Sequence, residues 1–176
     1  WRPRDLHGVI VSRGPGSYTG LRVGVMSAKA LAYATGCALL AVETFPVLAA
    51  QAPAEVLALD VIADAQQGRV YVQGFARPAA GAAWEARQPL AIRPLTEWLA
   101  NRDPAAWVTG PGLQPYGKRL PEGVRTTDPA LWHPQPEGLL RLGLARYLAG
   151  ERDDVYAVEP LYLRPSAAEQ QWQGGR

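Results

Sequence analysis

The chain has 176 residues, of which 48% are hydrophobic and 19% are charged, so it can bury a core as one globular domain or two small lobes. A net charge of +2 without any basic run excludes a strongly basic nucleic-acid-binding protein. The sequence has no apolar stretch of the roughly 18–20 residues that span a membrane, no signal-peptide pattern, and only Cys37, so we expect a cytoplasmic protein without membrane contact or intramolecular disulfides.

The first predicted elements are a strand, a glycine turn and a helix. Residues 6–12 are a short apolar, β-branched run that predicts a buried strand. In the turn that follows, Gly14 and Gly16 permit backbone conformations closed to other residues, and Ser17 or Thr19 can cap a helix. Residues 21–34 contain no proline, which predicts a helix of about four turns.

This helix is predicted to be apolar around most of its circumference. At about 100° per residue, one side carries Leu21, Gly24, Val25, Ala28, Leu31 and Ala32, and the opposite side carries Val23, Ala30 and Ala34. Such a helix is buried on more than one side. Two interpretations follow: a helix enclosed in a large core, or a helix between its own sheet and a partner that approaches along Gly20, Gly24 and Ala28.

The remaining sequence predicts further α/β structure. We expect strands at 37–42, 56–63, 70–75, 89–92 and 107–110, helices at 45–52, 95–100 and 137–149, and an extended arm at 160–165. The proposed division is an N-terminal lobe (1–52), a C-terminal lobe (53–165) and a polar tail (166–176).

Two acidic residues stand in or beside the strand predicted at 56–63. Asp60 and Asp64 could hold a metal or polarise a phosphate site, but neither a third ligand nor a glycine-rich phosphate loop stands beside them. We favour the structural interpretation, in which Asp64 tops a turn and Asp60 faces solvent.

Few residues of catalytic type are present. His7 and His133 are far apart, and with one cysteine the usual His/Cys metal site cannot be assembled. Residues 16–20 fit the G-x-S-x-G pattern between a strand and a helix, so a serine hydrolase using Ser17 is one alternative. Contact of Gly14, Gly16, Ser17 and Asp64 with an anion or nucleotide is another, although the lysine of a P-loop is missing.

Four stretches of the sequence carry a family resemblance. The run GPGSYTGLRVGV at 14–25, followed by SAKALA at 27–32, resembles the signature of the TsaB family, the bacterial dimerisation subunits of tRNA threonylcarbamoyladenosine synthesis. AVETF at 41–45, DAQQGRVY at 64–71 and EPLYLR at 159–164 are similar to that family in the same order. In the family a substantial segment with strands and a helix precedes the glycine motif, so we expect this chain to lack that segment and to expose a sheet edge.

The resemblance implies a fold and a function. The fold is the actin-like ATPase (ribonuclease H-like) α/β fold with two small lobes. The function is that of a non-catalytic dimerisation subunit in the complex that transfers a threonylcarbamoyl group to the adenosine beside the anticodon of tRNAs reading codons that begin with A. The alternative of the same fold is a free-standing nucleotide-dependent transferase or ATPase.

The resemblance also implies partners. They are a TsaD-type transferase and a TsaE-type ATPase, with homodimers in their absence and tRNA bound only through the complex. It implies no cofactor or metal for this chain, with ATP only in the assembled complex. We place the partner interface on the helix after the glycine motif, at Tyr18, Thr19, Gly20, Leu21, Gly24, Val25, Ala28, Leu31 and Ala32.

Overall fold

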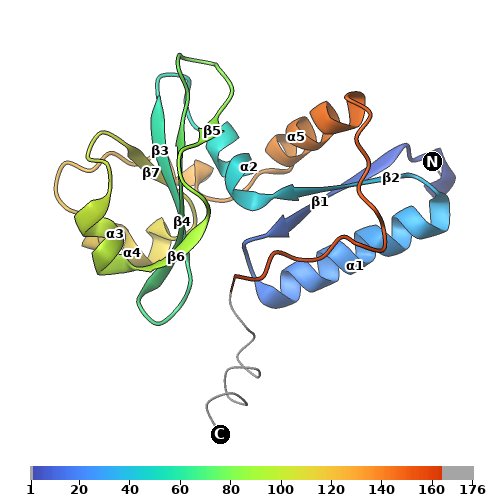
Figure 1. Ribbon diagram of the computed structural model, residues 1–176, viewed down its shortest axis with the longest axis horizontal. Helices are drawn as coiled ribbons and strands as arrows, with labels where there is room; N and C mark the ends of the chain where they lie inside the picture. The colour runs from blue at the N-terminus through green and yellow to red at the C-terminus, as the bar shows by residue number, and fades with distance from the viewer. Residues whose placement is uncertain (1, 164–176) are drawn as a thin grey trace, which may run out of the picture. The chain divides into compact units, whose positions relative to one another are not determined.

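The computed structural model describes residues 2–163, which divide into two compact units (Figure 1). Unit 1 combines the chain up to Thr44 with the chain from Leu139 onward, and unit 2 is the continuous segment Phe45–Gly138. This division differs from the expected one, because residues 139–163 pack with residues 2–44 rather than continuing the second lobe. The predicted polar tail lies outside the described residues.

Unit 1 begins with a strand–helix–strand segment. Strand β1 (Gly8–Gly14) pairs in parallel with β2 (Ala38–Glu43), and α1 (Tyr18–Thr35) connects them, after a short 3-10 turn, η1 (Pro3–Asp5). Within residues 2–163, β2 is the only strand that pairs with β1. Gly36 ends α1, with φ 71° and its N–H bonded to the carbonyl of Ala32.

Two helices cover opposite faces of the β1–β2 sheet (Figure 1). Alternate residues of β1 point to opposite sides, so Val9 and Val11 pack with α1 while Ile10 meets α5 (Pro136–Leu148). A Cβ at Gly143 would lie only 2.4 Å from Ile10 Cγ2. Because glycine has no side chain, α5 can lie directly on β1 at Gly143.

Unit 2 is built on a mixed five-stranded sheet. Strands β3 (Ala58–Asp64) and β4 (Arg69–Ala76) form an antiparallel hairpin, and β7 (Trp107–Thr109) joins β3 in parallel. The other edge of β4 pairs with β5 (Glu85–Ala86) and β6 (Ala91–Pro94). The remaining elements are α2 (Thr44–Ala50), α3 (Leu95–Asn101), α4 (Leu113–Tyr116), η2 (Gly117–Arg119) and η3 (Pro129–Leu131).

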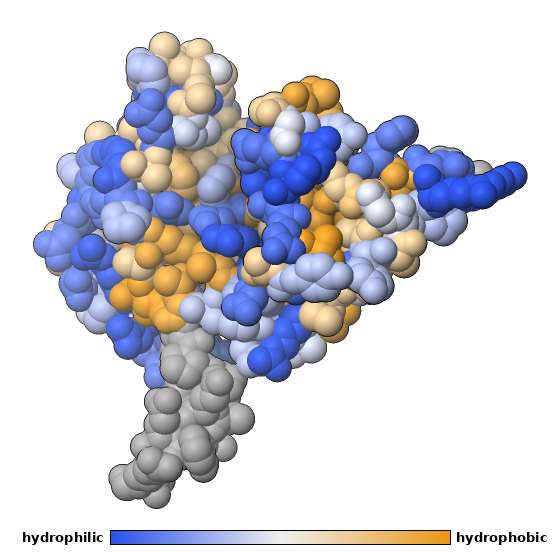
Figure 2. Space-filling view, turned by 45° about the vertical axis from the view of Figure 1, so that its right-hand side comes forward, coloured by the Kyte–Doolittle hydropathy of each residue, from blue (hydrophilic) through white to orange (hydrophobic). Residues whose placement is uncertain are grey.

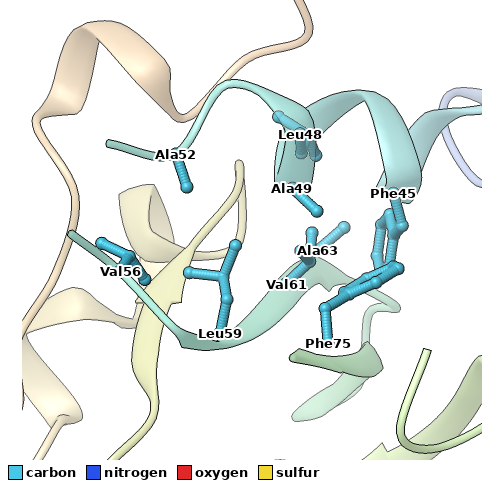
Figure 3. Packing of buried hydrophobic residues seen from close by; sticks show 9 residues of the cluster. All are labelled: Phe45, Leu48, Ala49, Ala52, Val56, Leu59, Val61, Ala63 and Phe75. Atoms are coloured by element: carbon cyan, nitrogen blue, oxygen red, sulfur yellow. The ribbon is translucent and has the colours of Figure 1, made fainter. Parts of the chain in front are cut away.

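Apolar side chains on both faces of the hairpin explain why β3 reads as an almost continuous apolar run. One face packs against α2, in a cluster that Figure 3 shows from close by: Phe45, Leu48, Ala49, Ala52, Val56, Leu59, Val61, Ala63 and Phe75. The other face carries Ile62, Val70 and Val72 against α3 and α4. Both cores are made by side chains that alternate along the same two strands.

The second Gly-Pro-Gly sequence, at residues 110–112, allows the chain to pack closely against β3. A Cβ at Gly110 would lie 2.3 Å from the carbonyl oxygen of Ile62, and the φ of Gly110 is 109°. The turn after β7 therefore needs glycine to approach β3 so closely. Among the helices of the described chain, none is long and apolar enough to cross a bilayer.

Candidate interface around helix α1

The glycine motif forms the turn that starts α1. Gly14 has φ 115°, and a Cβ there would lie 2.9 Å from Leu21 Cδ1, so the turn is closed against the first helical turn. Gly16 is exposed at the bend. Ser17 is the N-cap of α1, because its Oγ accepts a hydrogen bond of 3.3 Å from the N–H of Gly20. Helix capping thus accounts for the serine of the G-x-S-x-G pattern.

The inner side of α1 is the side on which the sequence had placed the partner. Val25, Ala28 and Ala32 are only 1%, 5% and 2% exposed, and they pack in the core of unit 1 with Leu39, Val9 and Val11. Gly24 also faces this sheet, with Val11 Cγ2 3.8 Å from where its Cβ would be. On this side of α1, Val25, Ala28 and Ala32 are occupied by packing on the chain's own strands, and Gly24 permits a close approach to them. Leu21 and Leu31 are half-buried beside them.

The outer side of α1 is apolar and exposed. Val23 and Met26 are each 62% exposed and Tyr33 is 70% exposed, and Ala30 and Ala34 are exposed on the same side. Their spacing places them on one stripe of the helix. Of the predicted interface residues, Thr19 and Gly20 are exposed and Tyr18 is half-buried. Figure 2 shows hydrophobic residues reaching the surface in patches among hydrophilic ones.

An irregular segment at the end of the described chain runs beside α1. This segment, residues 153–163, is called the strap below. Lys29 Nζ donates to the carbonyl oxygens of Tyr156 (3.3 Å) and Val158 (3.0 Å), and Arg22 Nε donates to the hydroxyl of Tyr162 (2.9 Å). The ring of Tyr162 lies 4.8 Å from that of Tyr18. The charged residues of α1, Arg22 and Lys29, therefore hold the strap against this helix.

The start of the strap closes the outer edge of β2. Asp153 donates its N–H to the carbonyl of Leu39 and accepts the N–H of Ala41 on Oδ2 at 2.7 Å. Arg146 of α5 donates to the carbonyl of Ala41 and to Asp153 Oδ1. The hydrogen bond to Glu151 is the largest of several interactions that raise the pKa of Arg146. Both backbone groups of Ala41 are thus satisfied by side chains.

In unit 2, Asp60 is buried, so the expectation that it faces solvent is wrong. Asp60 is 6% exposed. Trp98 Nε1 donates a hydrogen bond of 3.2 Å to Asp60 Oδ2, and Arg87 Nη2 lies 4.0 Å from Asp60 Oδ1. Gly74, opposite Asp60 on β4, leaves room for the carboxylate. Burial raises the pKa of Asp60, and the hydrogen bond from Trp98 and the charges of Arg102 and Arg87 oppose that shift.

Asp64 tops a turn, as predicted. Its Oδ1 accepts a hydrogen bond from the N–H of Gln66 and another from the hydroxyl of Tyr116, both at 2.7 Å. The hydrogen bond with Asp64 raises the pKa of Tyr116. Asp64 belongs to unit 2 and the glycine turn to unit 1. Within residues 2–163 no three His, Cys, Asp or Glu side chains form a group that could hold a metal ion.

Sequence comparison finds relatives over most of the chain. The TsaB protein of Bacillus subtilis (strain 168), named for tRNA threonylcarbamoyladenosine biosynthesis, is 30% identical over 176 residues, covering 97% of this chain and 75% of that protein. The TsaB protein of Escherichia coli (strain K12) is 30% identical over 172 residues, covering 93% and 73%. The family model of TsaD, tRNA N6-adenosine threonylcarbamoyltransferase, matches residues 1–82.

Solved structures agree with these relatives. YeaZ from Pseudomonas aeruginosa superposes with a TM-score of 0.76 at 25% identity, covering 92% of this chain and 76% of that one. A crystal structure described as an uncharacterized protein with similarity to peptidase YEAZ, also from Pseudomonas aeruginosa, gives a TM-score of 0.75 at 25% identity, covering 93% and 76%.

Proposed function

The chain belongs to the TsaB family of tRNA threonylcarbamoyladenosine biosynthesis proteins, and from this premise we propose that it acts there as a non-catalytic subunit that binds its partner through the outer face of α1. Its α/β fold is that of the TsaD-like, actin-like superfamily. Its role in the synthesis of threonylcarbamoyladenosine in tRNA follows from the family. We further propose that it acts in the cytoplasm, with a TsaD-type transferase and a TsaE-type ATPase as partners.

The residue chemistry supports a non-catalytic role. Ser17 is engaged as the helix N-cap and Asp64 holds a turn, so two of the residues considered for chemistry have structural roles. Asp60 lies buried against Trp98. In the described part of the chain, no cluster of metal-ligating side chains is formed. The transfer step would then be carried out by another subunit, with tRNA and a TsaE-type ATPase bound to the assembled complex.

The relationship to TsaD supports a transferase of that family as the partner. Residues 1–82, which match the TsaD model, include all of α1, so a TsaD-type transferase carries a counterpart of this helix. Two related helices can pack their outer faces about an approximate two-fold axis, as in isologous contacts. The observation that carries the proposal is the exposed apolar stripe of Val23, Met26 and Tyr33 on a helix whose inner side is already buried.

Charge insertion tests this interface. Val23→Lys and Met26→Lys each place an ammonium group on the outer face of α1 without touching the core. Burying such an unpaired charge costs on the order of 2–5 kcal/mol of association, so we expect binding to the TsaD-type transferase of the same genome to weaken at least about 30-fold by calorimetry. Leu148→Lys, at a residue 76% exposed on α5, is the control.

The outcomes separate the alternatives. If both α1 variants keep the parent affinity and fold, the interface lies elsewhere. If the purified chain alone transfers a threonylcarbamoyl group to tRNA, the non-catalytic assignment is wrong.

A further inference from the structure

We propose that the strap is part of the partner-binding surface, with Tyr156 as an aromatic anchor beside Tyr33; this inference rests on the proposed function above. Tyr156 is 76% exposed and Tyr33 is 70% exposed. Their rings meet edge to face, with centroids 6.2 Å apart and planes at 76°. The strap thereby adds a large aromatic side chain to the apolar stripe of α1.

The backbone of Tyr156 is fixed although the strap is irregular. Lys29 Nζ donates to its carbonyl oxygen, and its N–H donates to Asp154 Oδ1 at 2.8 Å. On either side of it, Val155 and Val158 pack into the core of unit 1 with Ala28 and Ala32. These contacts hold the residue in place while its ring projects outward, so binding requires less ordering of the surface.

The outer face of α1 and the strap are continuous. Tyr18, Arg22, Lys29 and Tyr33 share the sector of α1 that contacts the strap. Tyr33 also belongs to the apolar stripe of α1, with Met26 and Val23. Large aromatic and methionine side chains therefore occupy the middle of the surface. Arg22 and Lys29 lie where α1 meets the strap, and they hold the strap in place. Tyrosine and methionine are enriched in the buried centres of protein interfaces, and anchors with large effects cluster there.

The occupant we assign is the counterpart of α1 in a transferase of the TsaD family. The family model that describes this transferase spans the whole of α1, so both chains present a related helix. A partner helix laid along Met26 and Val23 has the strap on one flank, where Tyr156 covers its side. The strap lies outside residues 1–82, which match the TsaD model. In the proposed complex it is therefore a part of the interface that only this chain provides.

The test compares variants of the full chain for affinity to the TsaD-type transferase. We expect Tyr156→Ala to weaken binding at least 10-fold and Tyr156→Phe to keep it, while Leu148→Ala, at a residue equally exposed at 76%, stays within twofold. Lys29→Met removes both hydrogen bonds to the strap carbonyls. It should speed hydrogen exchange of the strap amides and weaken binding less than Tyr156→Ala does.

The outcomes separate this inference from the proposed function. If Val23→Lys loses affinity while Tyr156→Ala binds like the parent, the strap is not part of the surface and the α1 interface stands. If both bind like the parent, both proposals fail. If Tyr156→Ala weakens only self-association in sedimentation experiments, the occupant is a second copy of this chain and our assignment is wrong. Melting curves establish folding, and Tyr156→Ser repeats the truncation if Tyr156→Ala is unfolded.

Discussion

Replacing Asp153 with alanine tests how the β1–α1–β2 segment is tied to the end of the described chain. Asp153 Oδ2 is the acceptor for the N–H of Ala41, a residue only 8% exposed, and Oδ1 pairs with Arg146. Alanine leaves the buried N–H without this acceptor. Asparagine keeps an acceptor oxygen for Ala41 but removes the charge that faces Arg146.

The expected magnitudes differ for the two substitutions. Losing a hydrogen bond to a charged group costs about 1.5–3 kcal/mol. The ion pair adds at most about 1 kcal/mol, because the side chains of Arg146 and Asp153 are 32% and 26% exposed and Arg146 keeps Glu151. We therefore expect Asp153→Ala to lower the free energy of unfolding by about 2–4 kcal/mol and Asp153→Asn by about 1 kcal/mol.

Urea unfolding followed by circular dichroism measures these differences, and hydrogen exchange reports on the Ala41 amide directly. The control is Asp5→Ala, because Asp5 accepts a backbone N–H from Arg2 at an exposed site and its loss should have little effect. Equal losses for alanine and asparagine at position 153 would refute the role of the acceptor. Losses below about 0.5 kcal/mol for both would refute the edge closure itself.

Three further predictions concern residues considered for chemistry. Ser17→Ala should lower stability by about 0.5–2 kcal/mol, as expected for a helix cap, and a fluorophosphonate probe should leave Ser17 unlabelled; stoichiometric labelling would show a nucleophile instead. Asp64→Asn should bring the pKa of Tyr116 down toward its ordinary value of 10.0 in an ultraviolet titration, and an unchanged pKa would contradict the hydrogen bond. Burial raises the pKa of Asp60, so the folded state binds its proton more tightly than the unfolded chain; the stability that Asp60 contributes is greatest at acid pH and is lost as pH rises through the folded pKa. Unfolding at a series of pH values should therefore show Asp60→Asn gaining on the parent from about pH 4 upward, and a constant difference would contradict this.

Local pattern predicted the elements that depend on neighbouring residues. The strand before the glycine turn, the helix after it and the helix that became α5 are all encoded within short windows, where periodicity and turn residues suffice. The turn at Asp64 was predicted for the same reason.

Contacts between distant residues could not be predicted in this way. Both sides of α1 are apolar, and the sheet that selects its inner side is not visible in the helix itself. The side-chain hydrogen bonds from α1 to the strap join residues 127 to 140 positions apart, such as Lys29 with Tyr156 and Arg22 with Tyr162. The sequence did contain a signal for the burial of Asp60, because this carboxylate lies inside an otherwise apolar strand. Its hydrogen-bond partner, Trp98 of α3, is 38 residues away and could not be identified from the strand itself.

The interleaved division of the chain has a consequence for its synthesis. Unit 2 is one continuous segment, so both of its cores are available as soon as residue 138 has left the ribosome. Unit 1 is made first but completed last, because α5 and the strap are translated more than ninety residues after β2, whose last residue is Glu43. At about 5–20 residues per second, the β1–α1–β2 segment waits for several seconds without the groups that cover Ile10 and close the edge at Ala41. A nascent chain in this interval exposes the apolar sheet face at Ile10 and the open strand edge at Ala41. We therefore expect chaperones to bind this form of the protein.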